Sequence, residues 1–363
     1  MAAFIYDEMV TTDQEMAGRR RIVVAVAASI EPGWVAAIKA VDDRLDVHCE
    51  PQPMLARQFQ GHSNDTGSVQ RTRDDEAHWG MTLAEAEIVL GWPNNTEQGL
   101  ADLVRIGTGL RWVQATVGGA GGLVEEAGLS VQELGRIRIT GVDVIQAGPL
   151  AEFAMFGLLA FAKQLPQLRS DSRGYPGRSV MSELAGQTLL VLGLGPAEVA
   201  RLVKAFGMRV LAVTRTGNGQ APNVDQLRPA RFLGDLLPVS HAVVQALPLT
   251  GKTKGLMGSG AMSRMRADAV LVNIGHGAVI DEEALVNGLA QGQPAAAVLD
   301  ATAAEALPSG SVLWSLPNVL ISSQDAAVSR RANERLLALF TANLRRYLAG
   351  EELVGLVRTY PYP

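Results

Sequence analysis

The hydrophobic positions of this chain gather into short apolar runs separated by helix-length stretches, a pattern typical of parallel α/β proteins. The first run, residues 21–27, predicts a buried strand, and residues 32–41 predict the helix that follows it. Two more runs, 87–92 and 110–115, end at turn residues, as strands buried on both faces do. We therefore expect a first series of parallel strands and helices in this part of the chain.

Two polar stretches flank or interrupt this series. Residues up to about Gly18 precede the first strand, and we expect them to form an arm that is flexible or clasps a partner, because termini are ordered only when tied down. The stretch from Gln60 to Gly80 is polar and contains Gly61 and Gly67. This composition predicts a long surface loop.

A second series begins after a strongly apolar stretch, residues 150–165, that predicts a helix. Six strands are then predicted, separated by spacers of helix or loop length: Thr188–Leu192, Arg209–Val213, Ala242–Ala246, Ala269–Val272, Ala296–Leu299 and Val319–Ser322. Six strands in this order predict a doubly wound parallel sheet. A last helix over 329–348, which ends at Gly350, is long enough to return to the first series.

Composition narrows the class of ligand. The chain has 363 residues, of which 47% are hydrophobic, enough for more than one core. Its formal net charge of -5 provides no basic field for nucleic acid, so we expect a small-molecule ligand. Cys49 and the neighbouring His48 are too few ligands for a structural metal, so no metal is expected. No apolar run reaches the length of a membrane span and no signal peptide is recognised, so we expect a cytoplasmic protein.

A candidate nucleotide loop follows the first strand of the second series. Gly193 and Gly195 lie between a strand and a helix, where glycine lets backbone N–H groups approach a pyrophosphate. The third glycine of the usual fingerprint is absent. Pro196, Ala197 and Glu198 follow instead, and the Glu198 carboxylate would repel a pyrophosphate. The alternative is an ordinary helix start, with Glu198 complementing the helix dipole.

The end of the next strand bears on the choice of dinucleotide. Val213 and Thr214 are followed by Arg215 and Thr216, and no acid stands where one would bind a ribose 2′-hydroxyl. Arg215 and Thr216 suit a 2′-phosphate, which favours NADP over NAD. The alternative for Arg215 is a solvated loop cation.

Several blocks of the sequence resemble the D-isomer-specific 2-hydroxyacid dehydrogenases. They follow one another between about Leu110 and Gly350: Leu150–Glu152, Leu189–Met208, Leu247–Thr250, Asn273–Asp281, Leu299–Asp300, Leu313–Trp314 and Asn343–Tyr347. The resemblance implies an α/β protein with two Rossmann-like or flavodoxin-like domains, each with a doubly wound parallel sheet, a cleft between them, and usually a homodimer. It assigns residues 1–147 and 328–363 to a substrate domain and residues 148–327 to a dinucleotide-binding Rossmann domain.

The resemblance also extends the set of candidate binding residues. Together with the nucleotide loop and the strand end described above, the residues expected to contact NADP or NAD are Gly193, Gly195, Pro196, Ala197, Arg215, Thr216, Leu247, Pro248, Ile274 and Asp300. In the substrate domain, Val117, Gly118 and Gly119 lie where backbone amides of the family contact the substrate carboxylate, and a glycine-rich anion nest is expected there. His241, which precedes a strand, is expected to be structural.

The catalytic positions depart from the family pattern. In the family an arginine holds the 2-oxo acid, a histidine passes a proton to the carbonyl oxygen, and a glutamate tunes the histidine. His276 occupies the arginine position, and imidazole lacks the two-pronged, permanently charged donor face that clamps a carboxylate. Gln324 occupies the histidine position and cannot shuttle a proton near neutral pH. Glu305 matches the glutamate.

Three hypotheses follow from these departures. In the first, His276 and Glu305 form a relocated acid–base pair and Gln324 holds a polar substrate atom, in an atypical NAD(P)-dependent oxidoreductase that reduces a carbonyl or oxidises an alcohol. In the second, the chain is a non-catalytic protein that senses a dinucleotide or regulates a partner. In the third, His276 and Glu305 serve a non-redox lyase or hydrolase. For His276 alone, a structural role bonding a loop carbonyl is the alternative.

Overall fold

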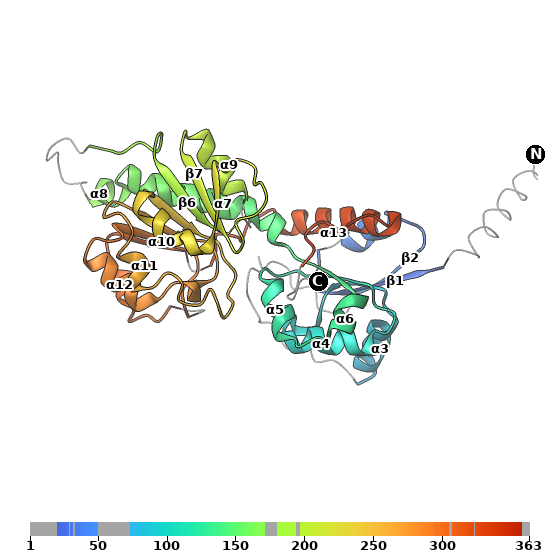
Figure 1. Cartoon of the computed structure of the whole chain (residues 1–363). Coiled ribbons are helices and arrows are strands. Elements are labelled where there is room, and N and C mark those ends of the chain that lie inside the picture. The colour runs from blue at the N-terminus through green and yellow to red at the C-terminus, as the bar shows by residue number, and fades with distance from the viewer. Residues whose placement is uncertain are drawn as a thin grey trace, which may run out of the picture. The chain divides into compact units, whose positions relative to one another are not determined.

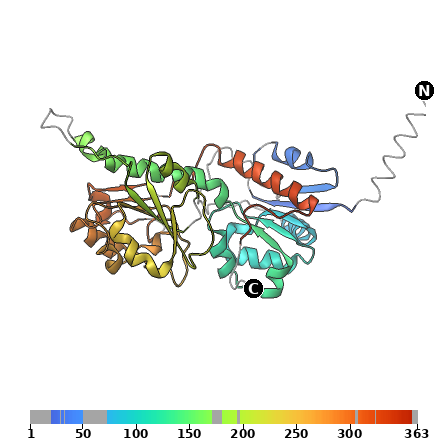
Figure 2. The ribbon, with the colours of Figure 1, turned by 45° about the horizontal axis from the view of Figure 1, so that its top comes forward.

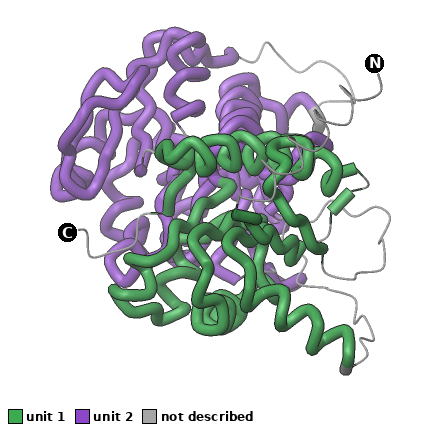
Figure 3. The backbone as a smooth tube through the Cα atoms, turned by 90° about the vertical axis from the view of Figure 1, so that its right-hand side faces the viewer, with its two compact units in different colours: residues 1–58, 63–142, 333–363 green, residues 59–62, 143–332 purple. Residues whose placement is uncertain are grey.

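The computed structural model describes residues 20–28, 30–31, 33–49, 73–170, 180–193, 197–304, 307–322 and 324–357. These residues divide into two compact units, which Figure 3 colours separately. Unit 1 comprises the described residues up to Val142 together with those from Asn333 onward, and unit 2 comprises those from Asp143 to Ala332. The predicted N-terminal arm and residues 60–72 of the predicted surface loop lie outside the described residues.

Unit 1 is built on a parallel sheet of five strands in the order β2-β1-β3-β4-β5. The strands are β1 (Ile22–Ala27), β2 (Leu45–Cys49), β3 (Ile88–Gly91), β4 (Trp112–Gln114) and β5 (Arg138–Thr140). The described helices are α2 (Trp34–Lys39), α3 (Arg73–Glu85), α4 (Glu97–Ile106), α5 (Ala120–Glu126), α6 (Val131–Arg136) and α13 (Ala332–Ala349), with the 3-10 turn η1 (Pro93–Asn95). This strand order is that of flavodoxin-like doubly wound sheets.

Part of the predicted surface loop is helical, so that prediction is wrong for residues 73–80. Helix α3 begins at Arg73, and Asp74, Asp75 and Glu76 lie in its first turn, where negative charge is favourable. Its buried side includes Trp79 and, four residues later and thus on the same face, Leu83. Few residues of this helix are apolar and buried, so the polar composition of the stretch did not predict it.

The C-terminal helix α13 packs against strands formed by the first half of the chain (Figures 1 and 2). The ring of Phe340 stacks on Trp112 of β4 with centroids 5.1 Å apart. Tyr347 stacks on the same indole at 5.8 Å, and its hydroxyl donates a 2.7 Å hydrogen bond to Glu87. Burial and this carboxylate raise the pKa of Tyr347 above its ordinary value. Both ends of the described chain therefore contribute to one core.

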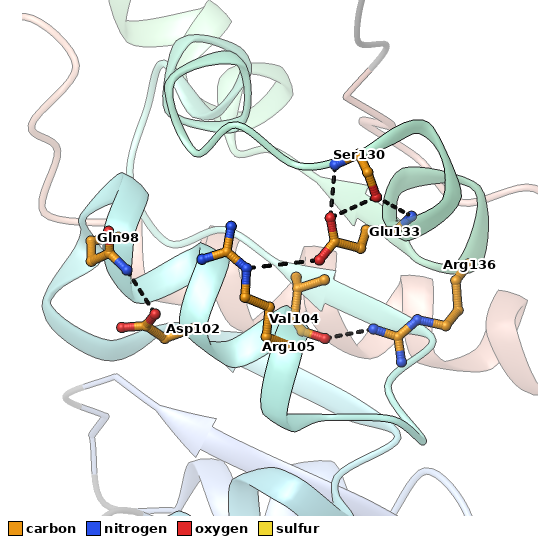
Figure 4. A network of polar contacts seen from close by, with 7 residues as sticks. All are labelled: Gln98, Asp102, Val104, Arg105, Ser130, Glu133 and Arg136. Carbon is orange, nitrogen blue, oxygen red and sulfur yellow. Dashed lines mark hydrogen bonds and ion pairs between the residues drawn. The ribbon is translucent and has the colours of Figure 1, made fainter.

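A polar network joins α4 to α6 within unit 1 (Figure 4). The guanidinium of Arg136 donates to the carbonyl oxygens of Val104 and Gly107 at 2.5 and 2.7 Å. These carbonyls belong to the C-terminal end of α4, where intrahelical donors are lacking. Helix α6 begins with a capping box in which Ser130 and Glu133 bond each other reciprocally, and the backbone N–H of Ser130 is the main cause of a lowered Glu133 pKa. Arg136 thus connects two helix ends.

Unit 2 is built on seven parallel strands in the order β12-β11-β10-β9-β6-β7-β8. The strands are β6 (Thr188–Leu192), β7 (Arg209–Thr214), β8 (Gln226–Pro229), β9 (Ala242–Gln245), β10 (Val270–Asn273), β11 (Ala296–Leu299) and β12 (Val319–Ile321). The described helices are α7 (Asp143–Ala162), α8 (Leu165–Ser170), α9 (Ala197–Ala205), α10 (Leu233–Leu236), α11 (Ser259–Met262) and α12 (Glu282–Ala290), with 3-10 turns η2 (Ala230–Phe232), η3 (Leu237–Val239), η4 (Gly277–Val279) and η5 (Val312–Ser315). The order reverses between β6 and β9, as in Rossmann sheets. The predicted fold class, with two doubly wound parallel sheets, is confirmed.

In unit 2 the sequence prediction misses one strand, β8, and in unit 1 it does not specify β2 and β5. The four residues of β8 are exposed or half-buried and form no apolar run. It pairs only with β7, at the edge of the sheet, where Pro229 is tolerated because one side of an edge strand needs no ladder donor. A strand of this kind leaves little trace in the hydrophobic pattern.

The long helix α7 begins at Asp143 rather than at Leu150, because Pro149 lies inside the helix and does not end it. Among the described residues, α7 is the one helix long and apolar enough to cross a membrane by length and composition, and 39% of its apolar window is buried in the protein. Ala154 and Leu158 on this helix pack into a core cluster of unit 2. The apolar composition of α7 is therefore accounted for in part by its packing into the core of unit 2.

Candidate functional site

The carboxyl ends of the central strands of unit 2 carry most of the predicted site residues. In doubly wound sheets, ligands bind at this edge, near the point where the strand order reverses. Leu192 of β6 is paired with Gln245 of β9, and Gln245 is paired with Asn273 of β10. The loops that follow these strands are therefore neighbours at the edge where a dinucleotide is expected.

The carboxamide of Gln245 fixes two of these loops. The side chain is fully buried, and its Nε2 donates to the backbone oxygen of His276 at 3.1 Å. Its Oε1 accepts from the backbone N–H of Leu247 at 3.0 Å. The backbone N–H of His276 donates in turn to the carbonyl of Leu247 at 3.2 Å. Gln245 thus holds the loop after β9 and the loop after β10 together.

Asn273 fixes the loop after β10 from its other side. Its Nδ2 donates to the carbonyl of Ala301 at 2.7 Å, and its Oδ1 accepts from the N–H of Gly275 at 3.1 Å. The loops approach so closely that glycine is required at two positions. A Cβ on Gly277 would lie 1.8 Å from the carbonyl oxygen of Thr302, and a Cβ on Gly275 would lie 2.1 Å from the carboxamide oxygen of Gln245. The two positions that flank His276 are therefore glycine because a side chain at either one would clash with neighbouring atoms.

His276 is exposed on the loop between β10 and α12. Its ring Nδ1 accepts a hydrogen bond from the N–H of Ala278 at 3.2 Å and caps η4. Because Nδ1 is an acceptor, the ring proton lies on Nε2 in this arrangement. The ring therefore binds a loop N–H rather than a loop carbonyl, and Nε2 is its donor. Glu305 lies outside the described residues, so the pairing of His276 with Glu305 stays a prediction.

Asp300 organises the loop after β12. This residue is 7% exposed, and its carboxylate accepts from the hydroxyl of Ser322 and from the N–H of Ala326. Its backbone oxygen accepts from the N–H of Gln324 at 2.6 Å. Gln324 has a φ of +67°, in the left-handed region that side-chain-bearing residues rarely adopt. Strain of this kind persists where neighbours hold it and clusters at ligand sites, so Asp300 positions Gln324.

The described ends of the nucleotide loop are Gly193 after β6 and Ala197 at the start of α9. Gly193 has a φ of +89°, and a Cβ there would lie 3.1 Å from a carbonyl of the loop after β9, so only glycine suits this position. Residues 194–196, which include Gly195 and Pro196, lie outside the described residues. Helix α9 begins at the exposed Ala197, and Glu198 forms a 2.7 Å ion pair with Arg201. The carboxylate expected to oppose a pyrophosphate is thus partly balanced by a cation one turn later.

The other residues expected to line the cofactor lie on the same edge. Leu247 and Pro248 follow β9 and are half-buried and exposed, respectively. Ile274 follows β10 and is 7% exposed. Arg215 and Thr216 follow β7, and both are exposed. All five positions therefore follow the carboxyl ends of parallel strands.

The predicted substrate loop belongs to unit 1. Val117 and Gly118 are half-buried between β4 and α5, and Gly119, with a φ of +73°, precedes the first turn of α5. The hydroxyl of Thr116 donates to the side-chain oxygen of Asn95 at 3.3 Å, which connects this loop to the one after β3. The loop lies at the carboxyl edge of the unit 1 sheet. The anion nest expected there stays a prediction.

Two titratable residues outside the candidate site are His241 and Cys49. His241 precedes β9, and its Nδ1 accepts from the N–H of Thr188 at 3.1 Å. Burial is the largest cause of the lowered pKa of His241, and nearby Arg266 adds to it. Burial also raises the pKa of the Cys49 thiol. Within the described part of the chain, no three His, Cys, Asp or Glu side chains are grouped so as to hold a metal ion.

Gln245 is the functional residue that sequence reasoning missed, and Asn273 appeared there only as part of a motif. Both end an otherwise apolar strand, which was the available signal. A buried carboxamide needs hydrogen-bond partners, and at a strand end the nearest ones belong to loop backbone. Which loops they hold depends on the neighbouring strands.

Comparisons with known proteins agree with this geometry. Residues 155–324 match the NAD-binding domain of the D-isomer specific 2-hydroxyacid dehydrogenases. A glyoxylate reductase of Aeropyrum pernix is 31% identical over 233 residues, which cover 61% of this chain and 69% of that protein. A glyoxylate reductase of Thermococcus gammatolerans is 32% identical over 229 residues, which cover 59% and 67%, respectively.

A solved structure also matches. It is a D-isomer specific 2-hydroxyacid dehydrogenase from Xanthobacter autotrophicus Py2, in complex with NADPH and MES. The TM-score is 0.72 at 25% identity, and the match covers 93% of this chain and 98% of that one. The family's NAD-binding domain contains the edge described above, so a nicotinamide dinucleotide, NAD or NADP, is confirmed as the cofactor class. This chain belongs to the D-isomer-specific 2-hydroxyacid dehydrogenase family.

Proposed function

We propose that this protein is an atypical oxidoreductase that uses NADP(H) in preference to NAD(H) and reduces a small carbonyl compound or oxidises the corresponding alcohol. The observation that carries the proposal is the placement of His276. Its ring is exposed at the carboxyl edge of the Rossmann sheet, on a loop held by Gln245, with a donor at Nε2. Because several relatives are named glyoxylate reductases, glyoxylate is the first substrate to test.

The ring of His276 has two ways to assist the reaction. A bound nicotinamide cofactor supplies or accepts the hydride. The Nε2–H group donates a hydrogen bond to the substrate oxygen, and this bond strengthens as negative charge develops there. Complete transfer of the Nε2 proton requires that Nδ1 first take a proton from solvent, so that the ring is neutral again after the transfer. Nδ1 must then release the N–H of Ala278, and its new N–H needs an acceptor. We assign that acceptor to Glu305, and a further substrate oxygen to the amide of Gln324.

Substrate anchoring must differ from the family pattern. A single imidazole N–H cannot clamp both oxygens of a carboxylate as a guanidinium does. We assign the remaining polar contacts to backbone amides of Val117, Gly118 and Gly119, in a substrate domain formed by residues 1–147 and 328–363. Residues 148–327 form the dinucleotide-binding domain in this proposal. NADP is favoured because Arg215 and Thr216, rather than an acid, follow β7.

Exposed apolar side chains on α7 and α8 support a homodimer, which we place in the cytoplasm. Val144 and Phe156 on α7 are 47% and 49% exposed, and Leu168 on α8 is 54% exposed. Exposed large apolar side chains on neighbouring helices suit burial against a second copy. Light scattering tests this: Phe156→Glu should shift the protein from dimer to monomer, whereas a monomeric wild type would contradict the proposal.

Two observations also suit the alternative of a dinucleotide sensor without turnover. Gln324 cannot shuttle a proton, and the Nδ1 atom of His276 is occupied by a backbone donor. The lyase or hydrolase alternative depends on the acid–base pair of His276 and Glu305 without a hydride acceptor. Binding and turnover measurements separate the three.

The deciding experiment titrates the protein with NADPH and NADH by fluorescence and then measures turnover of a carbonyl panel headed by glyoxylate. We expect NADPH binding, and a loss of kcat of about 100-fold or more in His276→Ala with unchanged NADPH affinity. His78→Ala removes an exposed histidine of α3 and serves as the matched control. Absence of binding for both nucleotides at millimolar concentration would exclude the oxidoreductase, and unchanged activity in His276→Ala would remove His276 from the mechanism.

A second experiment restores the family residues. The double variant His276→Arg and Gln324→His should gain reduction of 2-oxo acids, because it regains a bidentate carboxylate donor and a proton shuttle. The measurement is kcat/KM for a panel of 2-oxo acids against simple aldehydes. No change in that ratio would show that more than these two positions has diverged.

A further inference from the structure

A second arginine, Arg231, lies at the same edge of the unit 2 sheet as Arg215. It follows strand β8, which the sequence pattern missed. Strand β8 runs parallel to β7, with Thr214 paired to Pro229. A Cβ on Gly217 would lie 2.3 Å from the nitrogen of Pro229, so the turn after Arg215 rests on the end of β8. The turn η2 follows directly and carries Arg231.

Arg231 is held in place without using its hydrogen-bond donors. Its guanidinium carbon lies 5.0 Å from the centroid of the Phe232 ring, a cation–π contact that leaves the N–H groups unengaged. The side chain is exposed, and within the described residues none of its N–H groups has a partner and no carboxylate pairs with it. An oriented guanidinium with available donors is a receptor for an anion.

The neighbouring Arg228 has a different role. Its guanidinium also lies over Phe232, at 5.8 Å from the centroid. With its amide oxygen turned toward Arg228, Gln226 accepts from Nε and Nη2 at 2.6 Å each. Arg228 is therefore committed within the strand, and it helps to hold the Phe232 ring on which Arg231 rests.

We infer that Arg231 is a second anchor for the 2′-phosphate of NADP(H), acting with Arg215 to set the choice of cofactor. The inference rests on the proposed function. A phosphate monoester carries nearly two negative charges at neutral pH and accepts paired N–H donors from guanidinium groups. Neighbouring strands lie about 4.8 Å apart, so side chains that leave the ends of β7 and β8 can reach one phosphate. NAD(H), which lacks this phosphate, gains nothing from Arg231.

The test is calorimetric titration of the full chain with NADPH, NADH and 2′,5′-ADP, which needs no turnover. In Arg231→Gln we expect the Kd values of NADPH and 2′,5′-ADP to rise about tenfold or more, while the Kd of NADH stays within about twofold. Phe232→Leu removes the ring that orients Arg231 and should raise the same two Kd values by about threefold. Arg345→Gln, which removes an exposed arginine of α13, is the charge-matched control and should change none of them.

The outcomes separate the inference from the proposed function. An unchanged Kd for NADPH in Arg231→Gln, or an equal rise for NADPH and NADH, overturns the role of Arg231 and leaves the oxidoreductase intact. Failure of both dinucleotides to bind the wild-type protein overturns both. A selective rise for NADPH and 2′,5′-ADP supports the inference, and it should shrink at high salt because the contact is between charges.

Discussion

In each sheet of this protein an interior strand ends in a buried carboxamide, and the two carboxamides have different roles. In unit 1, Gln114 at the end of β4 accepts from the hydroxyl of Thr140 at 2.8 Å and bonds backbone carbonyls of its own unit through Nε2. In unit 2, Gln245 at the end of β9 holds the loop that presents the exposed His276. The amide of Gln114 satisfies buried hydrogen-bonding groups, and the amide of Gln245 positions a surface loop.

The network around Gln114 shows what the interior use achieves. Trp112 donates to the Thr140 hydroxyl at 2.8 Å, and Asn343 of α13 lies within 3.4 Å of Gln114. Asn343 also bonds both the N–H and the C=O of Val354, at 2.8 and 2.9 Å. A fully satisfied buried network fixes one arrangement of the chain. Here that arrangement places the C-terminal helix, so substitutions in the two regions should separate stability from activity.

The largest effect on stability is expected for Asn343→Leu. Removal of the amide leaves the N–H and C=O of the partly exposed Val354 without their side-chain partner and breaks the contact with the buried Gln114, which should lower the free energy of unfolding by about 2–3 kcal/mol. Urea unfolding followed by tryptophan fluorescence measures the change. Asn287→Leu, at an exposed position of α12, should change it by about 0.5 kcal/mol or less. A loss below about 1 kcal/mol in Asn343→Leu would contradict the importance assigned to this network.

Gln245→Met should lower enzymatic activity more than stability. The buried volume is kept, but the loop of His276 loses its tie to β9, and a displacement of about 1 Å at a catalytic group can lower turnover by about 100-fold. We expect kcat/KM for carbonyl reduction to fall at least about tenfold, with a loss of unfolding free energy of only about 1–2 kcal/mol. If this variant lost as much stability as Asn343→Leu while keeping its activity, the contrast between the two amides would be wrong.

Arg136→Met tests whether unit 1 depends on helix ends as well as on its buried network. Three carbonyls after or within α4, those of Val104, Gly107 and Thr108, lose their donor. The unfolding free energy should fall by about 1–2 kcal/mol, as seen from the melting temperature and urea midpoint. Arg105→Met removes only a 3.8 Å surface ion pair with Glu133 and should cost about 0.5 kcal/mol or less. Equal effects of the two substitutions would argue against the capping role.

The smallest effect is a pH dependence from His241, at the edge of unit 2 opposite the site. Burial lowers the pKa of His241, so the unfolded chain binds a proton more readily than the folded one. The stability that the neutral ring contributes is present above its ordinary pKa of 6.5 and is lost as the pH falls below that value. His241→Gln keeps an acceptor for Thr188 without titrating. Melting temperatures between about pH 5 and 8 should therefore vary less in this variant than in wild type.

The fold was largely predictable because strands buried on both faces must be apolar throughout. The six strands of the second series read as such runs and are all present, with small shifts at their ends. Strand β8 and helix α3 were not predictable in this way. The first is held by backbone pairing at an edge, and the second buries few side chains, Trp79 and Leu83 among them. Helix α7 begins at Asp143, before the apolar stretch that predicted it, and continues through Pro149.

The sequence predicts residue types for the candidate site but not their contacts. The candidate roles of His276, Asp300 and Gln324 are predicted from the motif positions alone. The donor that Ala278 provides to His276 and the hold of Asp300 on the Gln324 loop are not, because they depend on backbone conformation and on which loops follow adjacent strands. Glu305 lies outside the described residues, so its part in the site rests on the resemblance.

By itself, the sequence determined the class of protein: two βα series and, through the family resemblance, a nicotinamide cofactor. Apolar runs and residue types are local properties, and they can be read one position at a time. Only the tertiary structure decided which polar groups meet. Arg231 lies beside the turn of Arg215 because β8 pairs with β7, and the proton of His276 lies on Nε2 because a backbone N–H reaches Nδ1. Hydrogen bonds and charge contacts act over a few ångströms, so residues distant in sequence acquire their roles when the strands bring them together.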